Sequence, residues 1–172
     1  MYNIIRIKTG VICMIILQFL SISVYSQSFP EKCSGIWSGK MYIFNQGKVA
    51  DSVDIRLTIE KTDKNNYIWK TEYLSPKYPL IKDYLMKLPQ EGSNKFMLDE
   101  GDGIVLVGYL FGNKMYFVFE TSGILLTSSY ELINDQLVFE VSSGSKIEES
   151  ETKEVMNYTV KNIQRVVLQK QK

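Results

Sequence analysis

Short segments in which apolar and polar residues alternate run along this chain from residue 35 onward. In residues 52–61, Val53, Ile55, Leu57 and Ile59 alternate with polar residues. A period of two places the apolar side chains of a β-strand on one face and the polar ones on the other. The pattern predicts strands over residues 35–44, 52–61, 66–74, 94–99, 104–111, 114–121, 125–133, 136–143 and 157–169.

Most connections between these segments are short and rich in turn-forming residues. Asn45-Gln46-Gly47, Gly101-Asp102-Gly103, Gly112-Asn113 and Asn134-Asp135 tolerate the backbone conformations of tight turns. Closing such a sheet removes its exposed edges. We therefore expect an all-β domain, an antiparallel up-and-down meander closed into a barrel of eight to ten strands with one short helix. A two-sheet sandwich is the alternative.

Two longer connections interrupt the meander. Residues 75–93 contain three prolines and, between them, apolar residues at helical spacing: Leu80, Ile81, Tyr84, Leu85 and Leu88. This spacing predicts a short amphipathic helix that begins near Pro79, ends at Pro89 and covers one opening of the barrel like a lid. Residues 144–155 are rich in charge and predict a solvated loop.

The first residues have the pattern of an export signal. Arg6 and Lys8 precede the apolar stretch Val11 to Leu20, and small residues follow near Ser26. The stretch is shorter than a membrane span requires. We expect a signal peptide over residues 1–26 and a barrel domain over 27–172, exported to the periplasm or secreted, with no membrane span after cleavage. An uncleaved anchor is the alternative.

The composition narrows the chemistry. The chain contains no histidine, which excludes Ser-His-Asp and Cys-His nucleophile systems, His-ligated zinc and haem bound through a proximal histidine. A near-neutral charge without a basic cluster argues against a nucleic-acid partner. Cys33 is the one cysteine after the expected signal peptide, so no intramolecular disulfide is expected. We expect Cys33 to be half-buried rather than reactive or paired with another chain.

An acidic cluster occurs at one predicted turn. Asp99, Glu100 and Asp102 lie close together in the sequence and could contact calcium. A complete calcium site needs six or more oxygen ligands, so the pattern favours a plain acidic hairpin turn. We predict no metal site and no cofactor.

The segment Gly35-Ile36-Trp37-Ser38-Gly39 resembles the Gly-x-Trp opening of lipocalin-like, calycin-type β-barrels, here in a short exported bacterial form. The resemblance implies that Trp37 packs at the closed end of a barrel, with an arginine of the last strand lying across it. Arg165 is the candidate for that arginine. A structural closure role is favoured over ligand contact for this pair.

Six aromatic residues lie on predicted strand faces and would line the interior: Tyr67, Trp69, Tyr73, Phe117, Phe119 and Tyr130. Apolar rings with a few polar tips suit a ligand cavity, although a barrel of this size can also be filled by its own side chains. Arg56 falls on the polar face of its strand and is expected to face solvent.

These observations favour an exported, non-catalytic barrel that binds a small, mostly apolar ligand in its interior. The alternative is an interaction or structural module with a filled core that acts through its surface on an unidentified protein partner. An enzyme that uses an interior Tyr or Glu, such as an isomerase or cyclase, has the least support, and no catalytic residue is predicted.

Overall fold

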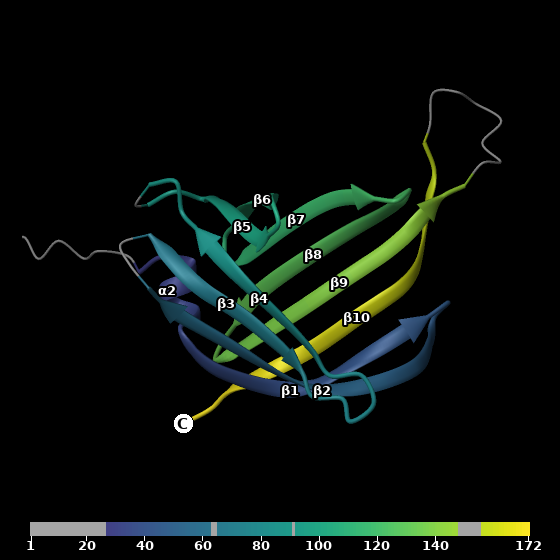
Figure 1. The fold of residues 1–172 in the computed structure, drawn as a ribbon, viewed down its shortest axis with the longest axis horizontal. Helices are drawn as coiled ribbons and strands as arrows, with labels where there is room; N and C mark the ends of the chain where they lie inside the picture. Colours follow the sequence, from purple (N-terminus) through teal and green to yellow (C-terminus); the bar gives the residue numbers. More distant parts are fainter. Residues whose placement is uncertain (1–26, 63–64, 91, 148–155) are drawn as a thin grey trace, which may run out of the picture.

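The computed structural model describes residues 27–62, 65–90, 92–147 and 156–172. The expected signal peptide and most of the charged loop predicted at 144–155 lie outside these residues. The described chain forms one closed antiparallel barrel in which each strand pairs with its neighbours in sequence and the last pairs with the first (Figure 1). The strands are β1 (Gly35–Asn45), β2 (Lys48–Lys61), β3 (Asn66–Tyr73), β4 (Leu80–Lys87), β5 (Lys95–Gly101), β6 (Ile104–Phe111), β7 (Lys114–Thr121), β8 (Ile124–Ile133), β9 (Gln136–Lys146) and β10 (Tyr158–Lys170). The predicted all-β meander is confirmed.

One helix, α2 (Phe29–Cys33), precedes β1 and lies at one end of the barrel (Figure 1). Ser28 is its N-cap, and Ser28 and Glu31 form a capping box, which satisfies backbone N–H groups that a short helix leaves free. Pro30 suits the first turn because its missing N–H would have no partner there. Sequence analysis missed this helix. Cys33, at its end, is fully buried rather than half-buried.

The lid helix predicted between the prolines is wrong. Leu80, Ile81, Tyr84 and Leu85 belong to strand β4, which pairs along its whole length with β3, and Leu88 follows directly. The first four residues of β4 are all exposed, so no polar–apolar alternation marks them as a strand. The apolar residues therefore matched a helical spacing by coincidence.

Tight turns join the other strands as expected. Gln46 and Gly47 both have positive φ angles, of 48° and 79°, between β1 and β2. Asn134 has a φ of 52° between β8 and β9. Several strands extend past their predicted bounds, since β2 begins at Lys48 and β9 ends at Lys146.

The barrel core fills the half of the barrel nearest α2. Its largest fully buried side chains include Trp37, Trp69, Phe96 and Phe117. Gly108 of β6 makes room for one of them, because a Cβ there would lie 2.6 Å from the ring of Phe117 and 2.5 Å from a backbone oxygen. Close packing of this kind leaves few voids.

Strand pairing is limited to short segments in two neighbouring strand pairs. β4 and β5 pair only between Leu85–Lys87 and Met97–Asp99. β6 and β7 pair only over residues 108–111 and 114–117, next to their connecting turn. Strands that separate beyond the paired segments leave space for an opening at the end opposite α2. Among the described residues, no helix has the length and apolar character to cross a bilayer.

Candidate ligand site inside the barrel

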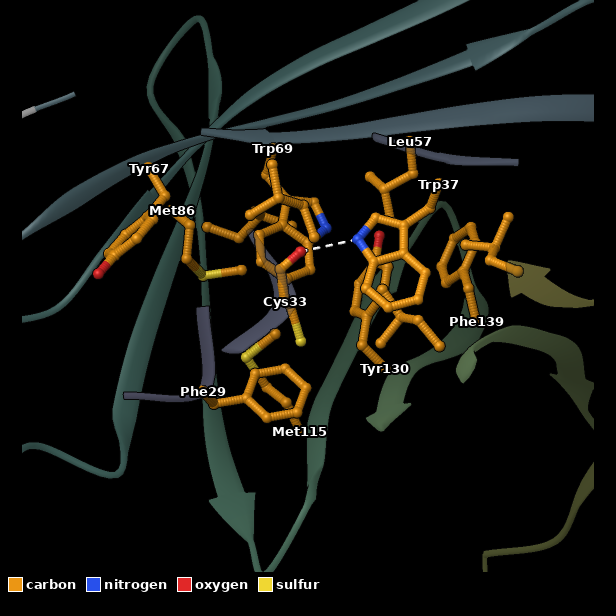
Figure 2. Packing of buried hydrophobic residues seen from close by; sticks show 14 of the residues in the cluster. Phe29, Cys33, Trp37, Leu57, Tyr67, Trp69, Met86, Met115, Tyr130 and Phe139 are labelled. Atoms are coloured by element: carbon orange, nitrogen blue, oxygen red, sulfur yellow. Dashed lines mark hydrogen bonds between the residues drawn. The ribbon is translucent and has the colours of Figure 1, made fainter. Parts of the chain in front are cut away.

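Trp37 and α2 together plug one end of the barrel. The indole of Trp37 is buried, and its Nε1 donates a hydrogen bond of 2.7 Å to the carbonyl oxygen of Cys33 (Figure 2). Lys170 of β10 is the register partner of Trp37, and its Nζ lies 5.4 Å from the indole centroid. Trp37 therefore fills this end of the barrel together with α2.

The proposed role of Arg165 is wrong. Arg165 pairs with Tyr42 near the other end of β1, and its Nε lies 3.2 Å from Glu140 on the exposed outer surface. The cation over Trp37 is supplied by Lys170 instead. The prediction failed because the pairing register of β1 with β10 places Lys170 opposite Trp37. Arg165 lies five positions earlier along β10, and its side chain points outward.

The barrel interior contains a pocket of about 150 Å³ at the end opposite α2. Its apolar wall comes from five consecutive strands, β5 to β9, and includes Leu98, Leu106, Phe117, Phe119, Leu126, Phe139 and Val141. Its polar groups are Thr71, Tyr73, Lys82, Tyr84, Glu100, Ser128, Tyr130 and Gln164. We call this space the inner pocket. Small-molecule sites usually combine an apolar wall with polar groups that orient the ligand, and in the inner pocket about half of the lining residues are polar.

Three phenols of the inner pocket are held in the neutral form. Burial raises the pKa of Tyr73. Burial, followed by the neighbouring Glu100 carboxylate that accepts a hydrogen bond from the phenol, raises the pKa of Tyr84. Burial also raises the pKa of Tyr130, which is the most enclosed of the three. A neutral phenol both donates and accepts hydrogen bonds, so these groups can orient an uncharged ligand.

Aromatic contacts fix Tyr130 in place. Its ring stacks on Phe139, with centroids 4.5 Å apart and an interplanar angle of 4°. Trp69 meets the same ring edge-on at 5.0 Å and 80°. Figure 2 shows Tyr130 and Phe139 near the plug residue Trp37. Among the described residues, no acceptor meets the buried Nε1 of Trp69 at hydrogen-bonding geometry.

The structure separates the predicted lining residues into two groups. Tyr73, Phe117, Phe119 and Tyr130 line the inner pocket. Trp69 lies in the packed core. Tyr67 points toward the plugged end, where its hydroxyl lies 3.3 Å from that of Ser28.

Sequence reasoning missed several polar members of the inner pocket. Thr71 could have been found, since it alternates with Trp69 and Tyr73 on one face of β3. Tyr84 and Lys82 were hidden by the wrong helix assignment. Glu100 was noticed only as part of the acidic cluster. Ser128 and Gln164 gave no signal, because single polar residues on an apolar face do not stand out in a sequence.

A second, larger cleft lies at the plugged end. It measures about 810 Å³ and runs between α2 and the loops that follow β4 and β6. Its lining residues include Lys61, Asn65 and Gly92, which flank positions outside the described ranges. The inner pocket is fully bounded by described strands and is the better candidate site.

Asp99, in the acidic cluster at the end of β5, makes contacts with neighbouring residues. A carboxylate oxygen of Asp99 lies 2.7 Å from Nζ of Lys87, and the other accepts a hydrogen bond from the backbone of Gly101. The bond from Lys87 lowers the pKa of Asp99, as does that from Gly101. Within the part of the chain that the structure describes, no group of acidic, cysteine or histidine side chains could hold a metal ion.

Comparisons with known proteins place the fold. No protein-family model matches the sequence, and no curated protein matches it significantly. Among solved structures, a variant of the fluorescent protein UnaG is similar at 18% identity and a TM-score of 0.50, covering 83% of this chain and 98% of that one. Rv2717c from M. tuberculosis is similar at 13% identity and a TM-score of 0.50, covering 82% and 94%. Likeness at such identities extends to the fold alone. Together with the ten-stranded closed barrel, it shows that this chain has the lipocalin-like, calycin-type barrel fold.

Proposed function

We propose that this protein is an exported, non-catalytic barrel that binds a small, mostly apolar molecule in the inner pocket. The observation that carries the proposal is the convergence of three neutral tyrosines on an apolar, aromatic-walled space inside the barrel. Such a site solvates a ligand's apolar body and orients its polar group. Periplasmic or secreted localisation rests on the pattern of residues 1–26.

The size of the inner pocket restricts the ligand. A volume of about 150 Å³ equals the space of about five water molecules and is below the usual range for drug-sized ligands. The packed core around Trp37 and Trp69 occupies the remaining interior. The ligand is therefore comparable in size to a singly substituted benzene ring.

Native mass spectrometry of protein purified from its own host tests this proposal. The wild type should retain a small molecule, and Ser128→Phe, which fills the inner pocket, should lose it. Val118→Phe places the same ring on the exposed outer face of β7 and serves as the matched control that keeps the ligand. Absence of any retained or titratable small molecule from the wild type contradicts the proposal.

A second candidate function has an observation of its own. The outer faces of β6 and β7 carry a group of exposed apolar side chains, namely Val105, Val107, Tyr109, Phe111, Tyr116 and Val118. Contiguous exposed apolar surface of this kind often marks a protein interface. A second copy of this chain is the partner to test first. Light scattering should then show a dimer that Val107→Lys weakens at least about ten-fold, whereas a monomer at every concentration removes this candidate.

A further inference from the structure

We propose that the inner pocket selects an uncharged molecule with a hydrogen-bond acceptor, such as a carbonyl oxygen, at its buried end, and that the Tyr130 hydroxyl donates to this acceptor. The inference rests on the proposed function and names the chemical class of the ligand. It depends on three features of the site: the fixed ring of Tyr130, the donors around its oxygen, and the charges that line the pocket.

The ring of Tyr130 cannot turn away from the pocket. Phe139 covers one of its faces and Trp69 abuts it edge-on, and the side chain is only 2% exposed. Aromatic contacts of this kind hold a ring in one orientation. The hydroxyl of Tyr130 is therefore a preorganised group, with little conformational entropy to lose when a ligand binds.

Two polar side chains lie beside the Tyr130 oxygen. The indole N–H of Trp69 and the hydroxyl of Thr71 both act against the effect of burial by lowering the pKa of Tyr130, and Trp69 Nε1 meets no acceptor among the described residues at hydrogen-bonding geometry. An indole N–H can only donate, so it cannot take the phenol proton. Thr71 and Tyr130 both line the inner pocket, so that proton is available to a ligand. Trp69 and Thr71 are positioning residues in this arrangement.

The charged side chains of the pocket do not favour an ion at this position. Lys82 and Glu100 are its charged lining residues and have opposite signs. Lys82 is exposed, with Nζ 5.8 Å from the ring centroid of Tyr84, and Glu100 is hydrogen-bonded to the Tyr84 hydroxyl. A carboxylate placed at Tyr130 would lose water without gaining a cation, which disfavours its binding there. A carbonyl oxygen needs only the one donor.

Three probes of nearly equal size separate the possibilities: acetophenone, a neutral acceptor; ethylbenzene, which has no acceptor; and benzoate, an anion. The ¹⁵N-labelled protein has two tryptophans and hence two indole N–H signals. That of Trp37 is bonded to Cys33 and serves as the internal reference, whereas that of Trp69 interacts with Tyr130. We expect acetophenone to bind about five- to ten-fold more tightly than ethylbenzene, the effect of one neutral hydrogen bond, and to shift the Trp69 signal.

Substitution of the donor tests the assignment. Tyr130→Phe should abolish the preference for acetophenone over ethylbenzene and leave ethylbenzene binding within about two-fold. Tyr67→Phe is the matched control, because Tyr67 is a buried interior tyrosine at the plugged end, and it should keep the preference. Should Tyr130→Phe not fold, Thr71→Val tests the same network through a reduced preference.

The outcomes distinguish this inference from the proposal on which it rests. Equal binding of acetophenone and ethylbenzene by the wild type, or tighter binding of benzoate, overturns the inference and leaves the pocket standing. An unchanged preference in Tyr130→Phe also overturns it. Failure of all three probes to bind at their solubility limits overturns the proposed function itself.

Discussion

At the residue scale, burial controls the ionisation of the interior side chains. Tyr73, Tyr84 and Tyr130 lie in one pocket, and for each of them loss of water is the largest cause of a raised pKa. The charged form of a buried phenol is disfavoured unless a cation compensates it. The three phenols of the inner pocket therefore stay neutral at neutral pH.

Alkaline pH should destabilise the protein through Tyr130. The unfolded chain releases the phenol proton near pH 10, whereas the folded protein, with the raised pKa, retains it. The contribution of the neutral Tyr130 phenol to the free energy of unfolding is thus complete below pH 10 and is lost as the pH rises above that value. The free energy of unfolding should fall by about 1.4 kcal/mol per pH unit for this group.

Urea unfolding at a series of pH values from 9 to 11.5 measures this slope. Tyr130→Phe should show a shallower decline, and Tyr109→Phe, at an exposed site on β6, should behave as the wild type. Equal slopes for all three proteins would show that Tyr130 ionises freely.

The thiol of Cys33 should react only slowly in the folded protein. Burial raises the pKa of its thiol to about 12, although Lys170 and Lys32 lower it in part. Because the thiolate is the nucleophile, native Cys33 should react with a disulfide reagent on the order of 100-fold more slowly than the urea-unfolded chain does. Cys13→Ser removes the other cysteine, so that the measured rate belongs to Cys33. Rapid labelling of the folded protein contradicts the buried position.

At the element scale, the short helix α2 acts as part of the barrel core. It is tied to the strands by the Trp37–Cys33 hydrogen bond, by the contact of Ser28 with Tyr67, and by an ion pair of 3.2 Å between Glu31 and Lys61. The ion pair is exposed and contributes little. Burial of Phe29 and Cys33 accounts for most of what holds this element in place.

Phe29→Ala should destabilise the protein by about 3 kcal/mol, because it removes a buried ring and leaves a cavity beneath the helix. Val49→Ala, at a position of β2 that is 59% exposed, should change the free energy of unfolding by less than about 0.5 kcal/mol. Denaturant unfolding of both variants measures the difference. A Phe29→Ala effect as small as that of Val49→Ala would mean that α2 only rests on the barrel surface.

Two elements show which information the sequence carries and which it lacks. β2 was recognised because Ile55, Leu57 and Ile59 alternate with exposed residues, as one-sided burial requires. β4 was mistaken for a helix because its first half is exposed on both faces and so has no such alternation. The wrong assignment of Arg165 had a different cause, since cross-strand register depends on turns and bulges throughout the sheet.

The candidate site, like the fold, was only partly predictable from the sequence. Of the aromatic residues on predicted strand faces, Tyr73, Phe117, Phe119 and Tyr130 line the inner pocket, and their contact with a ligand stays a prediction. Whether such a residue lies in a cavity or in the packed core depends on its height along the barrel axis. Trp69 and Tyr67 occupy the same strand as Tyr73 but lie closer to the plug, and only the assembled barrel reveals that difference.

At the scale of the whole molecule, closure between β1 and β10 makes an enclosed pocket possible. The two strands pair over Trp37–Ser38 with Gln169–Lys170 and over Tyr42–Asn45 with Asn162–Arg165. The closed barrel depends on the pairing of β1 with β10, because without it the sheet would be open and water would enter the interior. This pairing also joins strands at opposite ends of the described chain, so it closes a long loop at a large entropic cost.

A disulfide between β1 and β10 tests closure directly. Ser38 and Gln169 are register partners, and paired residues of antiparallel strands lie within the distance that a disulfide spans. Ser38→Cys with Gln169→Cys should oxidise readily and raise the free energy of unfolding by on the order of 2–4 kcal/mol, because the bond constrains nearly the whole unfolded chain. A reductant should abolish the gain. Ser38→Cys with Val118→Cys, on strands that do not pair, should form no internal bond, and equal cross-linking in both variants contradicts a closed barrel.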